Sequence, residues 1–132
     1  MGRKAQKYLN NVHQHELNKL MAFTVLWQIA ADINNCIYYT IMADELTDAD
    51  NNKEQFVLCF RWVDENLECH KDFIGLYKID NIKSDTLVAC LEHVLLRINT
   101  LIENARGQWF DGAANMTGMR NEVSMQILKK AP

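Results

Sequence analysis

The chain has 132 residues, of which 48% are apolar, and a net charge of −3. This length fits one domain, and a single Pro and five Gly exclude a linker or a disordered segment. The mild negative charge gives no support to non-specific nucleic-acid binding. The four cysteines lack a Cys-x-x-Cys spacing and favour a reducing, intracellular setting. The most apolar window, residues 20–33, is too short and too polar to span a membrane.

Residues 12–34 predict the first helix of the chain. Its apolar positions recur every four residues, which is the spacing of one helix face. We therefore expect this face to pack against the protein core, through Leu17, Met21, Val25, Ile29 and Ile33.

Three strands are predicted after this helix. Residues 36–43 are β-branched and aromatic, as in a buried central strand, and Asp44 is expected to end it. Residues 55–63 and 67–79 follow as two further strands. The short links between the three strands favour an antiparallel meander, and Gly75 suggests a bulge in the last of them.

A second helix is predicted from Ser84 or Asp85, either of which is a good N-cap, to about Thr100. Its apolar stripe consists of Leu87, Leu91, Leu95 and Ile98. Residues 105–110 then predict a fourth strand. A helical crossover before this strand places it parallel to a neighbour in the sheet.

Asn115 is a suitable cap for a last helix over residues 116–130. The predicted order is therefore helix-β-β-β-helix-β-helix. We expect an α/β fold with a mixed sheet in the strand order 3-2-1-4. In this order the first and fourth strands lie side by side.

Asp44 and Asp111 are the candidate site residues, because each directly follows an apolar strand. If the two strands are neighbours, about 4.8 Å apart, both carboxylates reach the same edge of the sheet. Carboxylate oxygens bind divalent ions such as Mg²⁺ and Mn²⁺. The alternative is that both aspartates are ordinary turn residues at strand ends.

Four motifs resemble the hAT superfamily of DNA transposases, and the branch found in zinc-finger MYM-type and related transposon-derived proteins is the most similar. The resemblance extends over roughly residues 12–130, and its last motif is long and specific. The motifs are Ala43-Asp44-Glu45-Leu46-Thr47-Asp48, Asn52-Lys53-Glu54-Gln55, Arg61-Trp62-Val63-Asp64 and Arg106-Gly107-Gln108-Trp109-Phe110-Asp111-Gly112-Ala113-Ala114-Asn115-Met116-Thr117-Gly118.

This resemblance implies a ribonuclease-H-like fold with an Asp-Asp-Glu triad that binds two Mg²⁺ or Mn²⁺ ions. Asp44 corresponds to the first catalytic aspartate and Asp111 to the second. The glutamate follows a helical insertion in the family, and this chain ends before it. The expectation is thus one partial ribonuclease-H-like domain over residues 1–132, with a leading helix in 1–35 and four strands and two helices of the core in 36–132.

The resemblance favours a fragment of a transposase catalytic domain that is inactive by itself because the third acidic residue is absent. In the parent family the domain cleaves DNA and transfers strands. One alternative is a domesticated protein-interaction module, and another is a nuclease completed by a partner chain. The fourth strand is expected to leave an open edge for a protein partner or self-association. Residence in the nucleus is implied by the resemblance; the cytoplasm is the alternative.

Overall fold

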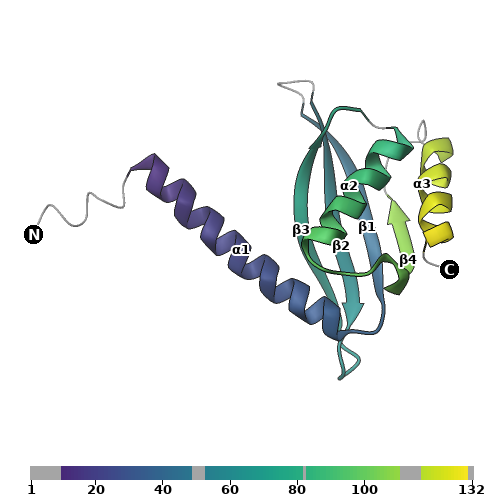
Figure 1. The fold of residues 1–132 in the computed structure, drawn as a ribbon, viewed down its shortest axis with the longest axis horizontal. Coiled ribbons are helices and arrows are strands. Elements are labelled where there is room, and N and C mark those ends of the chain that lie inside the picture. The colour runs from purple at the N-terminus through teal and green to yellow at the C-terminus, as the bar shows by residue number, and fades with distance from the viewer. Residues whose placement is uncertain (1–9, 49–52, 82, 111–116, 131–132) are drawn as a thin grey trace, which may run out of the picture.

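A computed structural model describes residues 10–48, 53–81, 83–110 and 117–130 (Figure 1). Within them the chain forms four strands, three α-helices and one short 3₁₀ helix. No helix in the described ranges is long and apolar enough to cross a membrane. The elements are α1 (Asn11–Asn35), β1 (Tyr39–Asp48), β2 (Lys53–Val63), β3 (Cys69–Ile79), α2 (Ser84–Arg97), η2 (Ile102–Asn104), β4 (Ala105–Phe110) and α3 (Thr117–Lys130).

The strands form one mixed sheet in the order β3-β2-β1-β4. β1, β2 and β3 are an antiparallel meander, and β4 lies parallel to β1 at the edge of the described sheet. The predicted fold class, strand order and crossover are confirmed. β1 differs in its bounds, because it begins at Tyr39 and continues to Asp48. The prediction that Asp44 ends the strand was therefore wrong.

The predicted bulge in β3 is confirmed. Leu58 of β2 pairs with Gly75, while its neighbour Cys59 pairs with Phe73. Ile74 is thus the extra residue on β3, and it is buried. The bulge shifts the alternation of β3. After it, Gly75 and Tyr77 lie opposite the buried Leu58 and Phe56, whereas before it the polar Asp72 lies opposite the buried Phe60.

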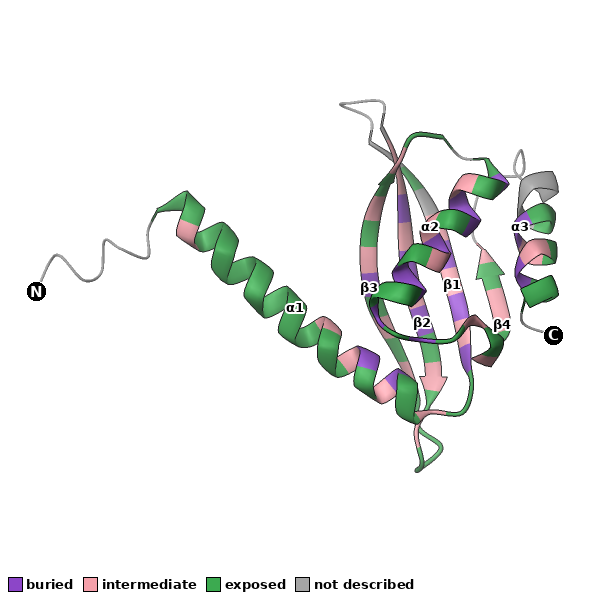
Figure 2. Ribbon diagram, viewed as in Figure 1, coloured by how far each residue is buried: buried purple, intermediate pink, exposed green. Residues whose placement is uncertain are grey.

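The core lies between the sheet and α2 (Figure 2). The predicted apolar stripe of α2 is buried in full, from Leu87 to Ile98. α2 ends at Arg97, shortly before Asn99, which adopts a left-handed φ of 54°. The predicted cap at its start is not observed, because Ser84 lies inside the first turn. Its hydroxyl instead donates to Glu122 of α3, at 3.0 Å.

Most of α1 does not pack against the core. The helix leaves the sheet obliquely, so only its C-terminal half lies near the rest of the described chain (Figure 1). Ile33 is buried and Ile29 is half-buried, but the side chains of Leu17, Met21 and Val25 are 44%, 66% and 58% exposed. The prediction that one face of the whole helix is core-packed was wrong. The apolar pattern continues beyond the point where the sheet ends.

The second face of the sheet is less covered than the face under α2. Alternation along β1 turns Ile41 and Ala43 toward α2, so Met42 and Asp44 belong to the other face. Large apolar side chains remain exposed there, among them Phe73 of β3 and Trp109 of β4. Asp44 is therefore located on the less covered face, and it is half-buried.

Candidate metal centre

The parallel pair of β1 and β4 positions the first candidate ligand. Among the described residues the pairing extends to Ala43 and Phe110, and each is followed in the chain by an aspartate. Asp44 is held in register on its other side by Val57 of β2. Asp111 lies outside the described residues. The meeting of the two carboxylates at one edge therefore stays a prediction.

A glycine allows β4 to approach β1 closely. A Cβ at Gly107 would lie 2.7 Å from Oγ1 and 3.0 Å from Cγ2 of Thr40, which is closer than such atoms pack. One bulge adjusts the register nearby, because Tyr39 pairs with Ala105 and Thr40 pairs with Gly107. Arg106 is the extra residue. Gly107, in the last of the four motifs, thus sets the spacing of the strand pair that precedes the two aspartates.

Hydrogen bonds fasten β4 and its flanking segments. The Gln108 side-chain amide donates to the carbonyl of Ser124 in α3, at 3.2 Å. The Tyr39 hydroxyl donates to the carbonyl of Leu101, at 2.9 Å. Burial, with smaller contributions from Glu103 and another nearby group, raises the pKa of Tyr39 well above its usual value. This phenol is therefore a structural donor that stays protonated.

A second polar cluster, which the sequence analysis did not predict, lies at the opposite end of β2. One oxygen or nitrogen each of Asp64, Glu68 and His70 lies within 4.8 Å of the others, a spacing that could hold a cation. Oδ2 of Asp64 accepts from Nε2 of His70 at 2.9 Å. Its Oδ1 accepts from the backbone N–H groups of Asn66 and Glu68, both at 2.9 Å. These hydrogen bonds close the β2–β3 turn, and this structural role is enough to explain why the three side chains lie together.

The electrostatics of this turn follow from its hydrogen bonds. The bond to Asp64 raises the pKa of His70, and the same bond lowers the pKa of Asp64. The His70 ring stacks on Trp62 with centroids 4.4 Å apart. Trp62 in turn donates through its indole N–H to Asp72, at 2.7 Å. The only sequence signal for this arrangement was that Asp64 and His70 flank a short turn.

Three antiparallel strands, a helical crossover and a fourth strand parallel to the first make this an RNase-like domain. The family model of the RNase-like domain of ZMYM1 and FAM200, DUF4371, matches residues 2–121, and the chain belongs to this family. No curated protein matches the chain significantly. The family membership confirms the resemblance to the RNase-like region of zinc-finger MYM-type proteins.

Proposed function

We propose that the chain carries the first part of a hAT-type transposase core, in which Asp44 and Asp111 are carboxylate ligands of Mg²⁺ or Mn²⁺. One observation supports this proposal: in the described residues the parallel pairing of β1 and β4 runs up to Ala43 and Phe110, and each of these is followed in the sequence by an aspartate. Membership in an RNase-like family supports it. The transposase origin also leads us to expect residence in the nucleus.

The residues fit a hard divalent cation. Asp44 offers carboxylate oxygens from a strand that is hydrogen-bonded on both sides up to its position, so its backbone is well fixed. Such ions, when bound, lower the pKa of an attacking water or hydroxyl and stabilise a leaving oxygen. Two aspartates balance only part of the charge of two divalent ions. We therefore propose that the chain binds metal weakly and does not cut DNA by itself.

Titration with Mn²⁺ tests the metal site, because the ion broadens NMR signals of nearby amides. We expect the broadening to centre on residues 42–46. In Asp44→Asn, which removes a charged ligand, the apparent affinity for Mn²⁺ should fall at least about tenfold. Asp111→Asn should have the same effect. The matched control is Asp64→Asn, which keeps the Oδ1 acceptor of the turn. Broadening centred on His70 that survives Asp44→Asn would contradict the proposal.

The same protein, incubated with supercoiled plasmid and Mn²⁺, tests the expected lack of cleavage. We expect no nicked product above the level given by Asp44→Asn. Nicking by the native chain that disappears in Asp44→Asn would show a complete nuclease, and would refute the inactivity while supporting the metal site. Mn²⁺-dependent nicking that survives Asp44→Asn would mean that the proposed metal site is wrong.

A second candidate function is a protein-interaction module that keeps the fold without catalysis. The exposed apolar surface of α1 favours it, because a soluble domain rarely leaves a large contiguous apolar patch without a partner. Exposed apolar side chains on the less covered sheet face, such as Leu76, also favour an interaction module.

A further inference from the structure

The central part of α1 has the composition of a buried helix but is exposed. No residue from Leu20 to Ala31 is charged at neutral pH. Within this run the side chains of Leu20, Phe23 and Trp27 are 62%, 42% and 64% exposed. Thr24 and Gln28 are the polar residues of this run, and a helix that is apolar over most of its circumference is normally covered by other protein. The described residues therefore leave this part of α1 uncovered.

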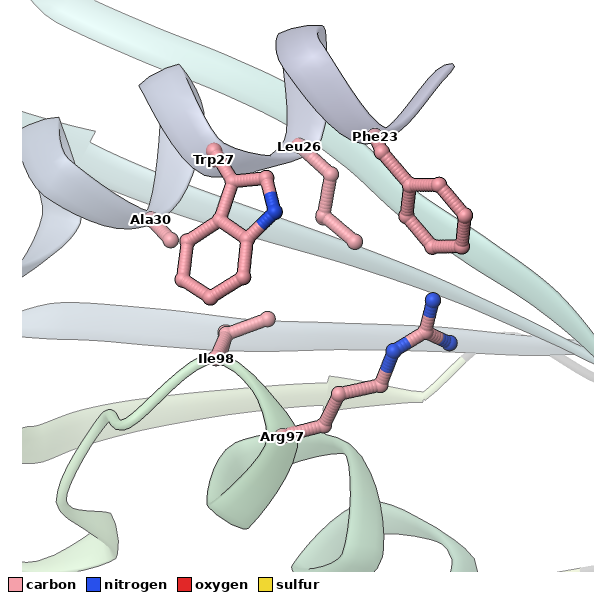
Figure 3. A pocket seen from close by; sticks show the side chains of 6 residues that line it. All are labelled: Phe23, Leu26, Trp27, Ala30, Arg97 and Ile98. Carbon is pink, nitrogen blue, oxygen red and sulfur yellow. The ribbon is translucent and has the colours of Figure 1, made fainter. Parts of the chain in front are cut away.

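A pocket of about 250 Å³ lies between α1 and the C-terminal end of α2. Figure 3 shows Phe23, Trp27 and Ala30 on one side of it and Arg97 and Ile98 on the other. The Arg97 guanidinium lies 5.3 Å from the centroid of the Phe23 ring. Among the described residues, no carboxylate forms an ion pair with Arg97. The pocket thus combines apolar walls with one cation that an anionic group could pair with.

Four residues of α1 form a seam along the helix. Glu16, Leu20, Phe23 and Trp27 are separated by four, three and four positions, the spacing with which paired helices meet. Phe23 and Trp27 also line the pocket. The seam therefore leads from an acidic residue, across apolar side chains, to the side of Arg97.

We propose that the partner of this seam is a second copy of the chain, with the two α1 helices antiparallel. A two-fold axis between Leu20 and Phe23 sets Leu20 of each copy against Phe23 of the other. It also sets Glu16 against Trp27, and so beside the Arg97 that lines the same pocket. Every contact then occurs twice, as a symmetric interface requires. Burial of the apolar side chains of the seam stabilises the dimer, and the Glu16–Arg97 pair sets the antiparallel orientation of the two helices.

A second copy of the chain fits this seam better than a different protein with a charged surface. The seam between Glu16 and Arg97 has no charge of its own, so two copies meet there without repulsion. Glu16, the one acidic residue of the seam, and Arg97, the cation of the pocket, complement each other across the axis. This inference rests on the second candidate function, the interaction module, and does not depend on the metal site.

Sedimentation across a dilution series tests the dimer. We expect the native chain to dimerise, and Leu20→Glu to raise the dissociation constant at least about tenfold, because it buries a charge. The matched control is Met21→Glu, which adds the same charge to an equally exposed neighbour on the same helix but off the seam. Circular dichroism of both variants verifies that the fold is kept.

Charge reversal tests the orientation of the helices. Glu16→Arg and Arg97→Glu should each weaken the dimer about three- to tenfold, and the double variant should restore it. Glu65→Arg, at an exposed glutamate in the β2–β3 turn, is the control for the charge added in Glu16→Arg and should leave the dimer unchanged.

Three results would overturn the proposal. These are a monomer at every concentration, a dimer equally sensitive to Leu20→Glu and Met21→Glu, and the absence of rescue in the double reversal. Failure of the dimer leaves the Mn²⁺ titration unaffected, since Asp44 lies on the sheet and not on α1. Loss of Mn²⁺ binding likewise leaves the sedimentation result intact. The two proposals can therefore fail separately.

Discussion

Asp64 and His70 make the turn between β2 and β3 sensitive to pH. The pKa of His70 is raised by its hydrogen bond to Asp64, so the stability it contributes is complete below the unfolded pKa, about 6.5, and is lost as pH rises through the folded pKa. The pKa of Asp64 is lowered, so its contribution is present above the unfolded pKa, about 3.9, and is lost as pH falls through the folded pKa. The pair therefore stabilises the turn most between these two values.

An NMR titration of the His70 ring checks this prediction. We expect a pKa above the ordinary histidine value in the native chain and a return toward that value in Asp64→Asn. Asparagine keeps the Oδ1 acceptor for the turn amides, so the variant tests the effect of the negative charge separately from that of the turn hydrogen bonds. Glu65→Gln serves as the control, because that neighbouring carboxylate forms no hydrogen bond with His70. An unchanged His70 pKa in Asp64→Asn would disprove the coupling.

At the scale of elements, the pairing of β4 with β1 depends on Gly107. We expect Gly107→Ala to lower the free energy of unfolding by about 1–3 kcal/mol, since the new Cβ would overlap the Thr40 side chain. Urea denaturation measures the loss. If the variant is as stable as the native chain, β4 can move away from β1 at little cost, and the close approach is not required.

The control for this prediction is the same change in a Thr40→Ala background. That background removes Oγ1 and Cγ2, and the nearest Thr40 atom left is Cβ, at 3.3 Å from the added methyl. The cost of Gly107→Ala should then fall to about 0.5 kcal/mol, and the two substitutions should be coupled. An equal cost in both backgrounds would mean that the backbone conformation, and not the contact, requires glycine.

At the scale of the whole molecule, the sequence predicted the fold well because its signals are local. Alternation marks the three antiparallel strands, and apolar periodicity marks α2. The continuation of β1 past Asp44 was missed because it depends on a partner, the paired stretch of β2 that begins at Lys53. Turn-forming residues after Asp44 suggested an earlier end.

Two further features could not be read from the sequence, for separate physical reasons. The stripe of α1 shows that one helix face is apolar, but periodicity does not say whether that face is covered by the same chain. The bond between Asp64 and His70 forms across a turn and shifts both pKa values, which single-residue patterns do not encode. Of the candidate site, the sequence predicted the strand pair before Asp44, and Asp111 lies outside the described residues.

The topology of the sheet also has a consequence for the order of folding. Few residues separate consecutive strands of the meander, whereas Ala43 and Phe110 pair across a long stretch of chain that includes β2, β3 and α2. Closing that stretch costs more chain entropy, and contacts between distant positions form slowly. In pulse-labelled hydrogen exchange during refolding, we expect amides of β2 to be protected before those of β4; the reverse order would contradict this. The strand edge beside Asp44 is then the last part of the sheet to form.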